Sequence, residues 1–358
     1  FKQKTAYEIM PSLVGSEMCI RDRSKSKKNL LYVKEQKELE FLTFYSDCIN
    51  FSRDLINSPA NKLNPSTYYS KIKNNNLFKS FNFIDYTEKE INSNFPLTCA
   101  VGKSSSSKPK VIEITNRKLS KKDKPLVIIG KGVTFDTGGV NIKPGTSMRN
   151  MKKDMGGSAI AISLFLLANY FLKKTKIVLI APIAENAISS KSMRPGDVYS
   201  SVSGKSVEIA HTDAEGRLLL ADAIEKASSY NPCMIIDFAT LTGAARVALG
   251  EDLPAYFCNN ETFAKKIENL NKEKLRCWRL PLYSPYLFKI KSQVADLSNA
   301  SLDGMAGSIT AALFLQEFLK SPNIPWFHFD TFAWSQDSKG AALQGLDIMS
   351  DFLRKNFN

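Results

Sequence analysis

The 358-residue sequence predicts an α/β fold, with a central mixed, largely parallel sheet flanked by helices. After Pro125, short β-branched or apolar runs alternate with helical stretches, and 43% hydrophobic against 23% charged residues is an ordinary globular composition with room for a sizeable core. The expected strands are residues 126–129, 176–182, 234–238 and 326–332, and the expected helices are 157–173, 217–229 and 310–320. In such a fold, ligand sites lie at the carboxyl ends of the strands.

The first segment of the chain, residues 2–23, has no clear hydrophobic period, and its character changes abruptly at Ser24. It resembles translated sequencing-adapter read-through, so we leave it out of the fold prediction. It lacks the basic start and the unbroken apolar stretch of a signal peptide. We expect residues 1–34 to be a remnant of an N-terminal region, artefactual or disordered up to about residue 23.

A long amphipathic helix is expected over residues 33–57, because apolar side chains recur there at helical intervals. These side chains are Leu39, Leu42, Tyr45, Ile49 and Ile56. Ser58 and Pro59 then stop the helix. Residues 62–120 mix Asn-rich polar stretches with short apolar pieces, which predicts small strands and helices joined by surface loops.

The charge and the cysteine content narrow the class of protein. Lys and Arg outnumber Asp and Glu by 49 to 35, and this net charge of +14 raises the question of a polyanionic partner. The lysines are spread through polar stretches without interleaved aromatic residues, so a solvated surface is the preferred interpretation. The six cysteines include no CxxC pair, which disfavours a disulfide framework or a cysteine-based zinc site and suits a reducing cytoplasm.

The longest apolar run, residues 160–172, is interrupted by Ser163 and Asn169. It is shorter than the ~20 residues that a membrane span needs. We therefore expect a buried helix here, and no membrane partner.

Three segments rich in glycine and acidic residues stand at expected strand-to-helix junctions. They are GKGVTFDTGG at residues 130–139, MKKDMGG at 151–157 and HTDAEGR at 211–217. Glycines just past a strand let a ligand approach the backbone closely. The phosphate-loop pattern GxxxxGK[ST] is met neither here nor at residues 101–104, which disfavours nucleotide binding. If residues 213–217 are extended, alternation places the two acids and the arginine on one side.

The acidic residues of these segments predict a metal site. Asp136, Asp154, Asp213 and Glu215 would repel one another if the sheet brought them together without cations, so their convergence implies divalent metal, and two ions rather than one. With only two histidines and no HExxH, carboxylates must supply most ligands. Lys131, between two glycines, can serve as a neutral amine ligand, because an adjacent dication depresses its pKa. Taken singly, each residue has a structural alternative, such as a salt bridge or a helix cap.

These blocks carry a family resemblance. GKGVTFDTGGVNIKP, MKKDMGG and TDAEGRLLLADA resemble the three signature blocks of the leucyl (cytosol) aminopeptidase family of dinuclear metallopeptidases, and DFATLTGAARVALG resembles the strand and substrate-lining loop that follow them. The similarity runs from about Glu35 to the C-terminus. It implies a linker helix over residues 35–60 and a catalytic aminopeptidase domain over 61–358, preceded by a truncated N-terminal domain.

The resemblance implies a metal-binding role for five residues. Lys131 matches the lysine ligand of the family, and Asp136 and Glu215 match its two bridging carboxylates. Asp154 matches a ligand of one metal, and Asp213 a ligand of the other.

It also implies catalytic and substrate-binding residues. Lys143 matches the catalytic lysine, and Arg217 matches the catalytic arginine that holds a bicarbonate. Four further residues fall where the family lines its substrate pocket. They are Met151, Thr240, Leu241 and Gly243.

The expected activity is hydrolysis of the N-terminal residue, leucine-like or of broad type, from peptides with a free N-terminus. Two divalent ions would supply an activated hydroxide, with Mn or Zn preferred and Mg or Co also suited to such ligands. Lys143 would stabilise the oxyanion, and the bicarbonate at Arg217 would carry the proton to the leaving amine. The family assembles as homohexamers, so a cytoplasmic homo-oligomer is implied.

Two alternatives and one departure from the family pattern stay open. A nucleic-acid-binding or catalytically weak protein on this scaffold is disfavoured because the ligands and the catalytic pair are all retained. A different two-metal hydrolase, such as a phosphatase, is disfavoured by Lys131 and the TDAEGR block. His211 stands where the family usually has Asn, either as a local hydrogen-bonding substitute or as a new metal ligand or base.

Overall fold

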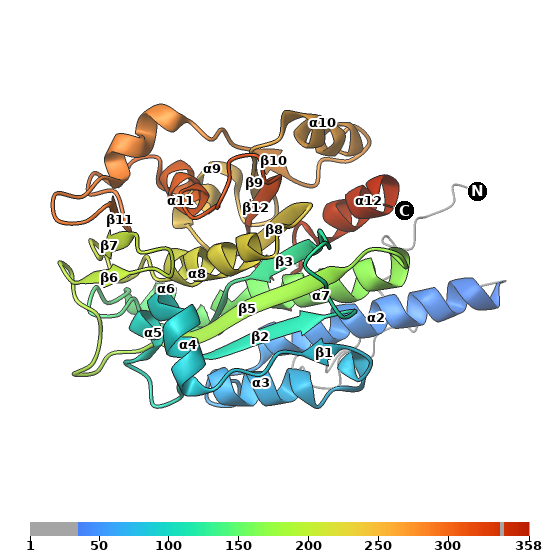
Figure 1. The fold of residues 1–358 in the computed structure, drawn as a ribbon, viewed down its shortest axis with the longest axis horizontal. Coiled ribbons are helices and arrows are strands. Elements are labelled where there is room, and N and C mark those ends of the chain that lie inside the picture. The colour runs from blue at the N-terminus through green and yellow to red at the C-terminus, as the bar shows by residue number, and fades with distance from the viewer. Residues whose placement is uncertain (1–34, 337–339, 358) are drawn as a thin grey trace.

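A nine-stranded sheet forms the centre of the computed structural model, which describes residues 35–336 and 340–357 (Figure 1). Its strands are β1 (Asn82–Phe83), β2 (Lys110–Thr115), β3 (Leu126–Gly130), β4 (Gly132–Asp136), β5 (Ile177–Asn186), β8 (Met234–Ala239), β9 (Ala255–Cys258), β10 (Trp278–Arg279) and β12 (Trp326–Asp330). They are ordered β1-β2-β5-β3-β8-β12-β9-β10, with β4 beside β5. The central strands β5, β3, β8 and β12 run parallel, whereas β2 and β9 run antiparallel to their inner neighbours. The predicted mixed, largely parallel sheet is confirmed.

The N-terminal part of the described chain is a helix followed by small elements. The helix predicted over 33–57 is confirmed as α2 (Gln36–Asn57), and it stops where the backbone N–H of Ser58 binds the carbonyls of Asp54 and Leu55. The predicted small elements are α3 (Pro65–Lys73), α4 (Glu88–Asn94) and α5 (Pro96–Gly102), together with β1 and β2. The expectations for residues 1–34 lie outside the described residues.

Two hydrophobic cores cover the two faces of the sheet. Along β3, Leu126 and Ile128 belong to one core, and Val127 and Ile129 belong to the other. The first core includes α2, α7 (Gly156–Phe171) and α12 (Leu346–Asn356), and the second includes α5, α8 (Gly216–Ser229) and α11 (Gly307–Gln316). Because both faces are covered, the central strands read as continuous apolar runs.

Helix α7 is buried on nearly all sides. Within the described residues, the helical stretch Met151–Phe171 is long and apolar enough to cross a membrane, but 83% of its apolar window is buried inside the protein. Helix α2 covers it, and Ser52 of α2 donates a hydrogen bond to the carbonyl of Ala159. The interpretation of this run as a buried helix is therefore confirmed.

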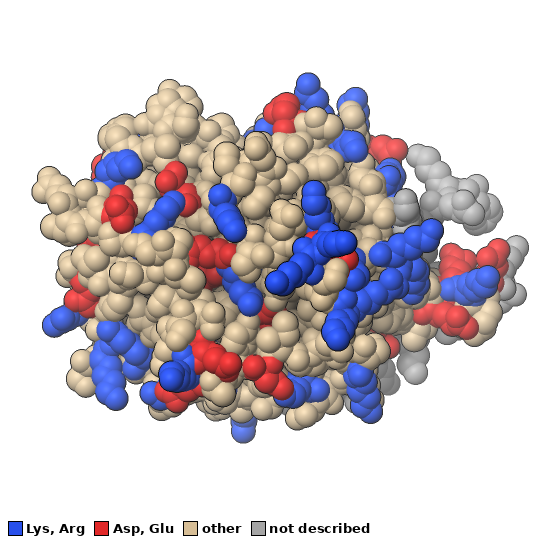
Figure 2. Space-filling model, in the orientation of Figure 1, with Lys and Arg blue, Asp and Glu red and all other residues tan. Residues whose placement is uncertain are grey.

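Basic and acidic side chains share the face of the molecule drawn in Figure 2. Lys and Arg gather most densely toward the right of that view. Asp and Glu are interspersed with basic residues across the face. The excess positive charge is thus distributed over a mixed surface on this side.

The start of α7 packs directly on the backbone of the sheet. A Cβ atom at Gly157 would lie 2.2 Å from the carbonyl oxygen of Phe238 in β8, and one at Gly130 would lie 2.4 Å from the Cα of Ser158. Only glycine fits at these two positions without moving backbone. This close approach carries the segment before α7 to the carboxyl ends of β3 and β8.

We expect Gly157→Ala to lower the free energy of unfolding by about 1–3 kcal/mol, because the added methyl must displace strand backbone in a packed interior. Urea unfolding followed by circular dichroism measures the change. Gly145→Ala is the matched control, since a Cβ there meets no heavy atom within 4 Å. Equal stability of the two variants would contradict the close packing of α7 on β8.

Candidate metal and active site

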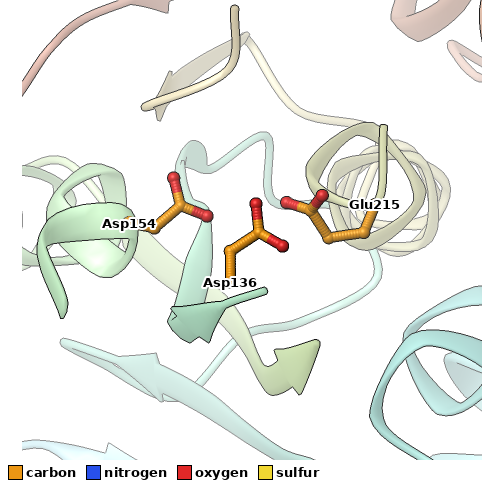
Figure 3. Close-up of side chains that lie close together, drawn as sticks. All are labelled: Asp136, Asp154 and Glu215. Atoms are coloured by element: carbon orange, nitrogen blue, oxygen red, sulfur yellow. The ribbon is translucent and has the colours of Figure 1, made fainter. Parts of the chain in front are cut away.

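Three buried carboxylates converge at the carboxyl end of the sheet. Asp136 is the last residue of β4, Asp154 lies in the short helix η3 (Met151–Met155), and Glu215 precedes α8. Figure 3 shows the three side chains pointing toward one another. One oxygen from each lies within 4.8 Å of the others. The structure thus brings together three of the four acids that the sequence selects.

The fourth acid, Asp213, lies at the rim of this group. Its side chain is 30% exposed, and its Oδ1 is 2.5 Å from the Nζ of Lys143. The same Nζ is 2.8 Å from Oδ2 of Asp136. Lys143 therefore joins the rim carboxylate to the buried group.

The alternative that residues 213–217 are extended is wrong. Asp213 lies in a turn, Glu215 has helical backbone angles (φ −73°, ψ −36°), and α8 begins at Gly216. Glu215 and Arg217 instead belong to the first turn of a helix, whose side chains diverge around the axis. This places Glu215 among the acids, while the guanidinium of Arg217 lies over the ring of Phe314.

Lys131 lies between β3 and β4 and reaches into the acidic group. Its Nζ is 2.8 Å from Oδ2 of Asp154 and 3.1 Å from Oε1 of Glu215, and it donates to the carbonyl of Thr240 at 2.9 Å. A Cβ at Gly216 would lie 2.4 Å from the Cε of Lys131, so the glycine of TDAEGR leaves the space that this side chain occupies.

The acidic group holds Lys131 as an ammonium. Burial lowers the pKa of Lys131, but the charges of Asp154 and Glu215 outweigh burial and raise the pKa above its usual value. A neutral amine ligand at this position therefore requires the field of a bound dication to reverse that balance.

The negative charges of the acids are not fully balanced by the lysines that pair with them. Burial, followed by the charge of Asp136, raises the pKa of Glu215 to about 8, and burial also raises the pKa of Asp154 and Asp213. Oε2 of Glu215 is buried, and no group in the described part of the chain forms a hydrogen bond with it. Buried carboxylates in excess of their cations are stabilised by divalent metal, so this donor set fits such ions.

The loop after β4 folds back to place Lys143 over the site. Gly138 and Gly139 have positive φ angles (87° and 66°), a conformation that favours glycine. The N–H of Gly138 donates to Oδ1 of Asp136, and the N–H of Lys143 donates to the carbonyl of Thr137. Both bonds tie the loop to the end of β4.

Arg217 is a buried guanidinium with free donors. The residue is 7% exposed, and its Nε and Nη1 have no hydrogen-bond partner among residues 35–336 and 340–357. Burial lowers its pKa to about 10, which still leaves it charged near neutral pH. A guanidinium in this situation presents a fork suited to a small anion.

The four residues expected to line the substrate pocket lie in η3 and in the segment from the end of β8 to the start of α9. Met151 and Leu241 are half-buried, and Gly243 is the exposed first residue of α9 (Gly243–Leu249). The hydroxyl of Thr240 lies 2.8 Å from both the carbonyl and Oδ1 of Asp154. Thr240 therefore orients a candidate metal ligand, a contact that the sequence did not suggest, and the pocket assignment stays a prediction.

Two polar residues at strand ends contact the site but were not predicted from the sequence. Asn186, at the end of β5, donates to Oδ1 of Asp136 (2.8 Å) and to the carbonyl of Thr212 (3.2 Å). Asp330, at the end of β12, accepts from the N–H groups of Leu241 and Thr242, each at 3.1 Å. Their signal was available, since each is a polar residue closing an apolar strand at the edge where ligand sites form.

His211 makes a local hydrogen bond. Its Nδ1 accepts from the N–H of Asp213 at 3.2 Å, and the residue is exposed. This geometry favours the local substitute over the metal-ligand alternative, since Asp136, Asp154 and Glu215 form their group without it.

Comparison with known proteins shows the family of this chain. Residues 50–349 match the family model described as the cytosol aminopeptidase family, catalytic domain. The chain belongs to the cytosol aminopeptidase family. The segment matched by the family model includes every residue of the candidate site. The predicted family is thereby confirmed.

Individual family members extend the comparison. The chain is 38% identical over 317 residues to the cytosol aminopeptidase of Encephalitozoon cuniculi, covering 87% of this chain and 64% of that one. It is 37% identical over 298 residues to a protein of Syntrophotalea carbinolica named "Probable cytosol aminopeptidase", covering 82% and 59%. The crystal structure of the cytosol aminopeptidase from Coxiella burnetii superposes with a TM-score of 0.82 at 40% identity, over 90% of this chain and 71% of that one. The chain thus spans about three fifths of the length of the two relatives compared by sequence.

Proposed function

We propose that this chain is the catalytic part of a metal-dependent aminopeptidase, which hydrolyses the N-terminal residue from peptides with a free N-terminus. The observation that carries the proposal is the buried group of Asp136, Asp154 and Glu215, with one oxygen from each within 4.8 Å of the others, in a chain of the cytosol aminopeptidase family. Lys131 and Lys143 complete the site, each within 3.1 Å of two of its carboxylates.

Two divalent ions would be held by the acids and Lys131. By the family resemblance, Asp136 and Glu215 would be ligands of both ions, Asp154 a ligand of one ion and Asp213 a ligand of the other. Mn or Zn suits this set of carboxylate and amine donors, and Mg or Co also fits it. When bound, such ions polarise a carbonyl and lower the pKa of water toward ~7.

Lys143 would act on the developing oxyanion. Burial lowers the pKa of Lys143, but the charges of the surrounding acids, Asp136 and Glu215 first among them, outweigh burial and raise the pKa above its usual value, which favours the ammonium form. It also stands at the more open side of the acidic group, with 15% of its side chain exposed. A fixed cation at that place can stabilise negative charge on the scissile carbonyl oxygen.

Arg217 would hold a bicarbonate that moves a proton to the leaving amine. The support is its pair of unpartnered donors, Nε and Nη1, in a buried position beside Glu215. An anion that accepts two hydrogen bonds would satisfy both donors, and Arg217 would then not pair with a carboxylate that binds metal. Met151, Thr240, Leu241 and Gly243 would line the pocket for the N-terminal side chain, leucine-like or of broad type. The family resemblance adds a cytoplasmic homohexamer to the proposal.

Hydrolysis of leucine p-nitroanilide beside N-acetyl-leucine p-nitroanilide tests the function. We expect the purified chain with added Mn or Zn to cleave only the free amine, and a chelator to abolish cleavage. Equal cleavage of the acetylated compound would contradict an aminopeptidase. Cleavage that survives the chelator, with metal shown to be removed, would contradict the metal centre.

A further inference from the structure

A buried lysine without an acidic partner lies beside the predicted substrate pocket. Lys153 stands in η3 between Met151 and Asp154 and is 4% exposed. Across the described chain, its ammonium makes no hydrogen bond or ion pair, and its one close polar contact is the ring of Phe332, whose centroid is 4.4 Å from Nζ. The neighbouring Asp154 carboxylate is engaged by Lys131 and Thr240 instead. Asp154 acts on the charge of Lys153 only from beyond ion-pair distance, so within the described residues the buried ammonium has lost its hydration without gaining an anion in contact with it.

A second cation faces the same ring. The guanidinium carbon of Arg246, in α9, is 4.8 Å from the centroid of Phe332. Arg246 is exposed, and among residues 35–336 and 340–357 it has no acidic partner. We call Lys153, Phe332 and Arg246 the cationic wall.

The cationic wall adjoins the predicted pocket through three packed segments. Phe332 lies two residues after Asp330, whose carboxylate accepts hydrogen bonds from the N–H groups of Leu241 and Thr242. The next residue, Ala333, is so close to α7 that a Cβ at Gly156 would lie 2.2 Å from its Cβ. The loop after β12 is therefore pressed between η3, which carries the candidate ligand Asp154, and the segment that begins α9.

We propose that the cationic wall binds the carboxylate of an acidic N-terminal side chain, so that the chain prefers peptides beginning with Glu or Asp. This inference rests on the proposed aminopeptidase function and narrows its leucine-like or broad specificity. A carboxylate would give Lys153 the contacting anion that the described residues do not supply, through charge-assisted hydrogen bonds. A leucine side chain leaves the buried ammonium unpaired, and a lysine side chain meets two like charges.

Paired substrates test this preference. The whole chain, loaded with Mn or Zn, is assayed for kcat/KM on the p-nitroanilides of Glu, Gln, Leu and Lys. Glu and Gln have nearly the same shape and differ by one charge. A hydrogen bond to a charged group stabilises a complex by about 1.5–3 kcal/mol. We therefore expect kcat/KM to be about tenfold or more higher for the Glu substrate than for the Gln substrate, and lowest for the Lys substrate. A Gln substrate cleaved as well as Glu would overturn the inference.

Two variants assign the preference to the wall. Lys153→Met and Arg246→Met are each expected to reduce the Glu-to-Gln ratio several-fold, whatever the absolute rates. Arg246 is exposed, so its variant tests the inference even where loss of the buried lysine disturbs folding. The control is Lys152→Met, because the ammonium of Lys152 donates to the carbonyl of Asn57 and the variant removes the same charge from the same turn. A ratio that is unchanged in both wall variants would refute the assignment.

Binding separates this inference from the proposed function. Calorimetry compares free glutamate with free glutamine in the metal-loaded chain and needs no turnover. Suppose that leucine p-nitroanilide is cleaved, but neither kcat/KM nor the binding affinity is higher for glutamate than for glutamine. The inference alone is then wrong. If no p-nitroanilide is cleaved while glutamate still binds more tightly and Lys153→Met removes that difference, the inference stands and the peptidase proposal fails.

Discussion

Replacing Lys143 with alanine is expected to lower kcat by about 10²–10³-fold, the usual effect of removing one donor that stabilises an oxyanion. Divalent metal should stay bound, because Lys143 is a cation that pairs with two of the candidate ligands, Asp136 and Asp213, rather than a ligand itself. Its removal frees those carboxylates for the ions, so metal affinity should be unchanged or higher.

Two measurements on one protein check this expectation. Steady-state hydrolysis of leucine p-nitroanilide gives kcat, and calorimetric titration with Mn or Zn gives the metal affinity. Lys191→Ala is the control, since it removes an equal charge from an exposed position. Loss of metal binding in Lys143→Ala would show that this lysine supports the metal centre instead of the oxyanion.

Glu215→Gln is expected to abolish hydrolysis and to weaken metal binding by more than about 100-fold. Changes to groups that merely orient metal ligands already reduce affinity by about 10–100-fold, and Glu215 would bridge both ions. Its Oε2 is buried with no hydrogen-bond partner among the residues that the structure describes, so the amide would find little there to bind in place of metal. In a buried group of carboxylates, losing one negative charge also removes part of the attraction for the dications.

Metal-dependent thermal stability measures this loss. Ligands that bind only the folded state raise Tm with concentration, so the wild-type chain should gain Tm on addition of Mn or Zn, and Glu215→Gln should not. Glu225→Gln, on the same helix but paired with Ser201 and Ser203, is the matched control. An equal metal-induced shift in both variants would exclude Glu215 as a ligand.

The sheet and its helices were predictable because each strand and helix has a local signal. The runs expected at 126–129 and 234–238 are buried on both faces as β3 and β8, and the helix expected at 157–173 is α7. Some strand and helix boundaries differ by a few residues from the predicted ones, because packing outweighs the local hydrophobic pattern there. For example, β5 continues to Asn186, beyond the apolar run that predicts it, because its end pairs with β4.

The candidate site was predictable only as a set of residue types. Spacing and family resemblance selected Asp136, Asp154 and Glu215, but no local pattern predicts that Lys143 would cross to Asp213 or that Thr240 would hold Asp154. Those contacts join segments far apart in the chain, so their geometry depends on the packing of the whole sheet. The extended alternative for residues 213–217 failed for the same reason, since alternation alone cannot tell a strand from the first turn of a helix.

The hydrogen bond from Lys131 to the carbonyl of Thr240 spans 109 residues of sequence. Its acceptor directly follows β8, so this bond of the lysine forms only after β8 has been synthesised and added to the sheet. Loop closure over such a distance is entropically costly, and the contact forms together with the core rather than before it. A nascent chain therefore emerges from the ribosome before the candidate site is complete. If the chain is a peptidase, its activity arises only when the fold is finished, which protects unfolded copies of the same chain during synthesis.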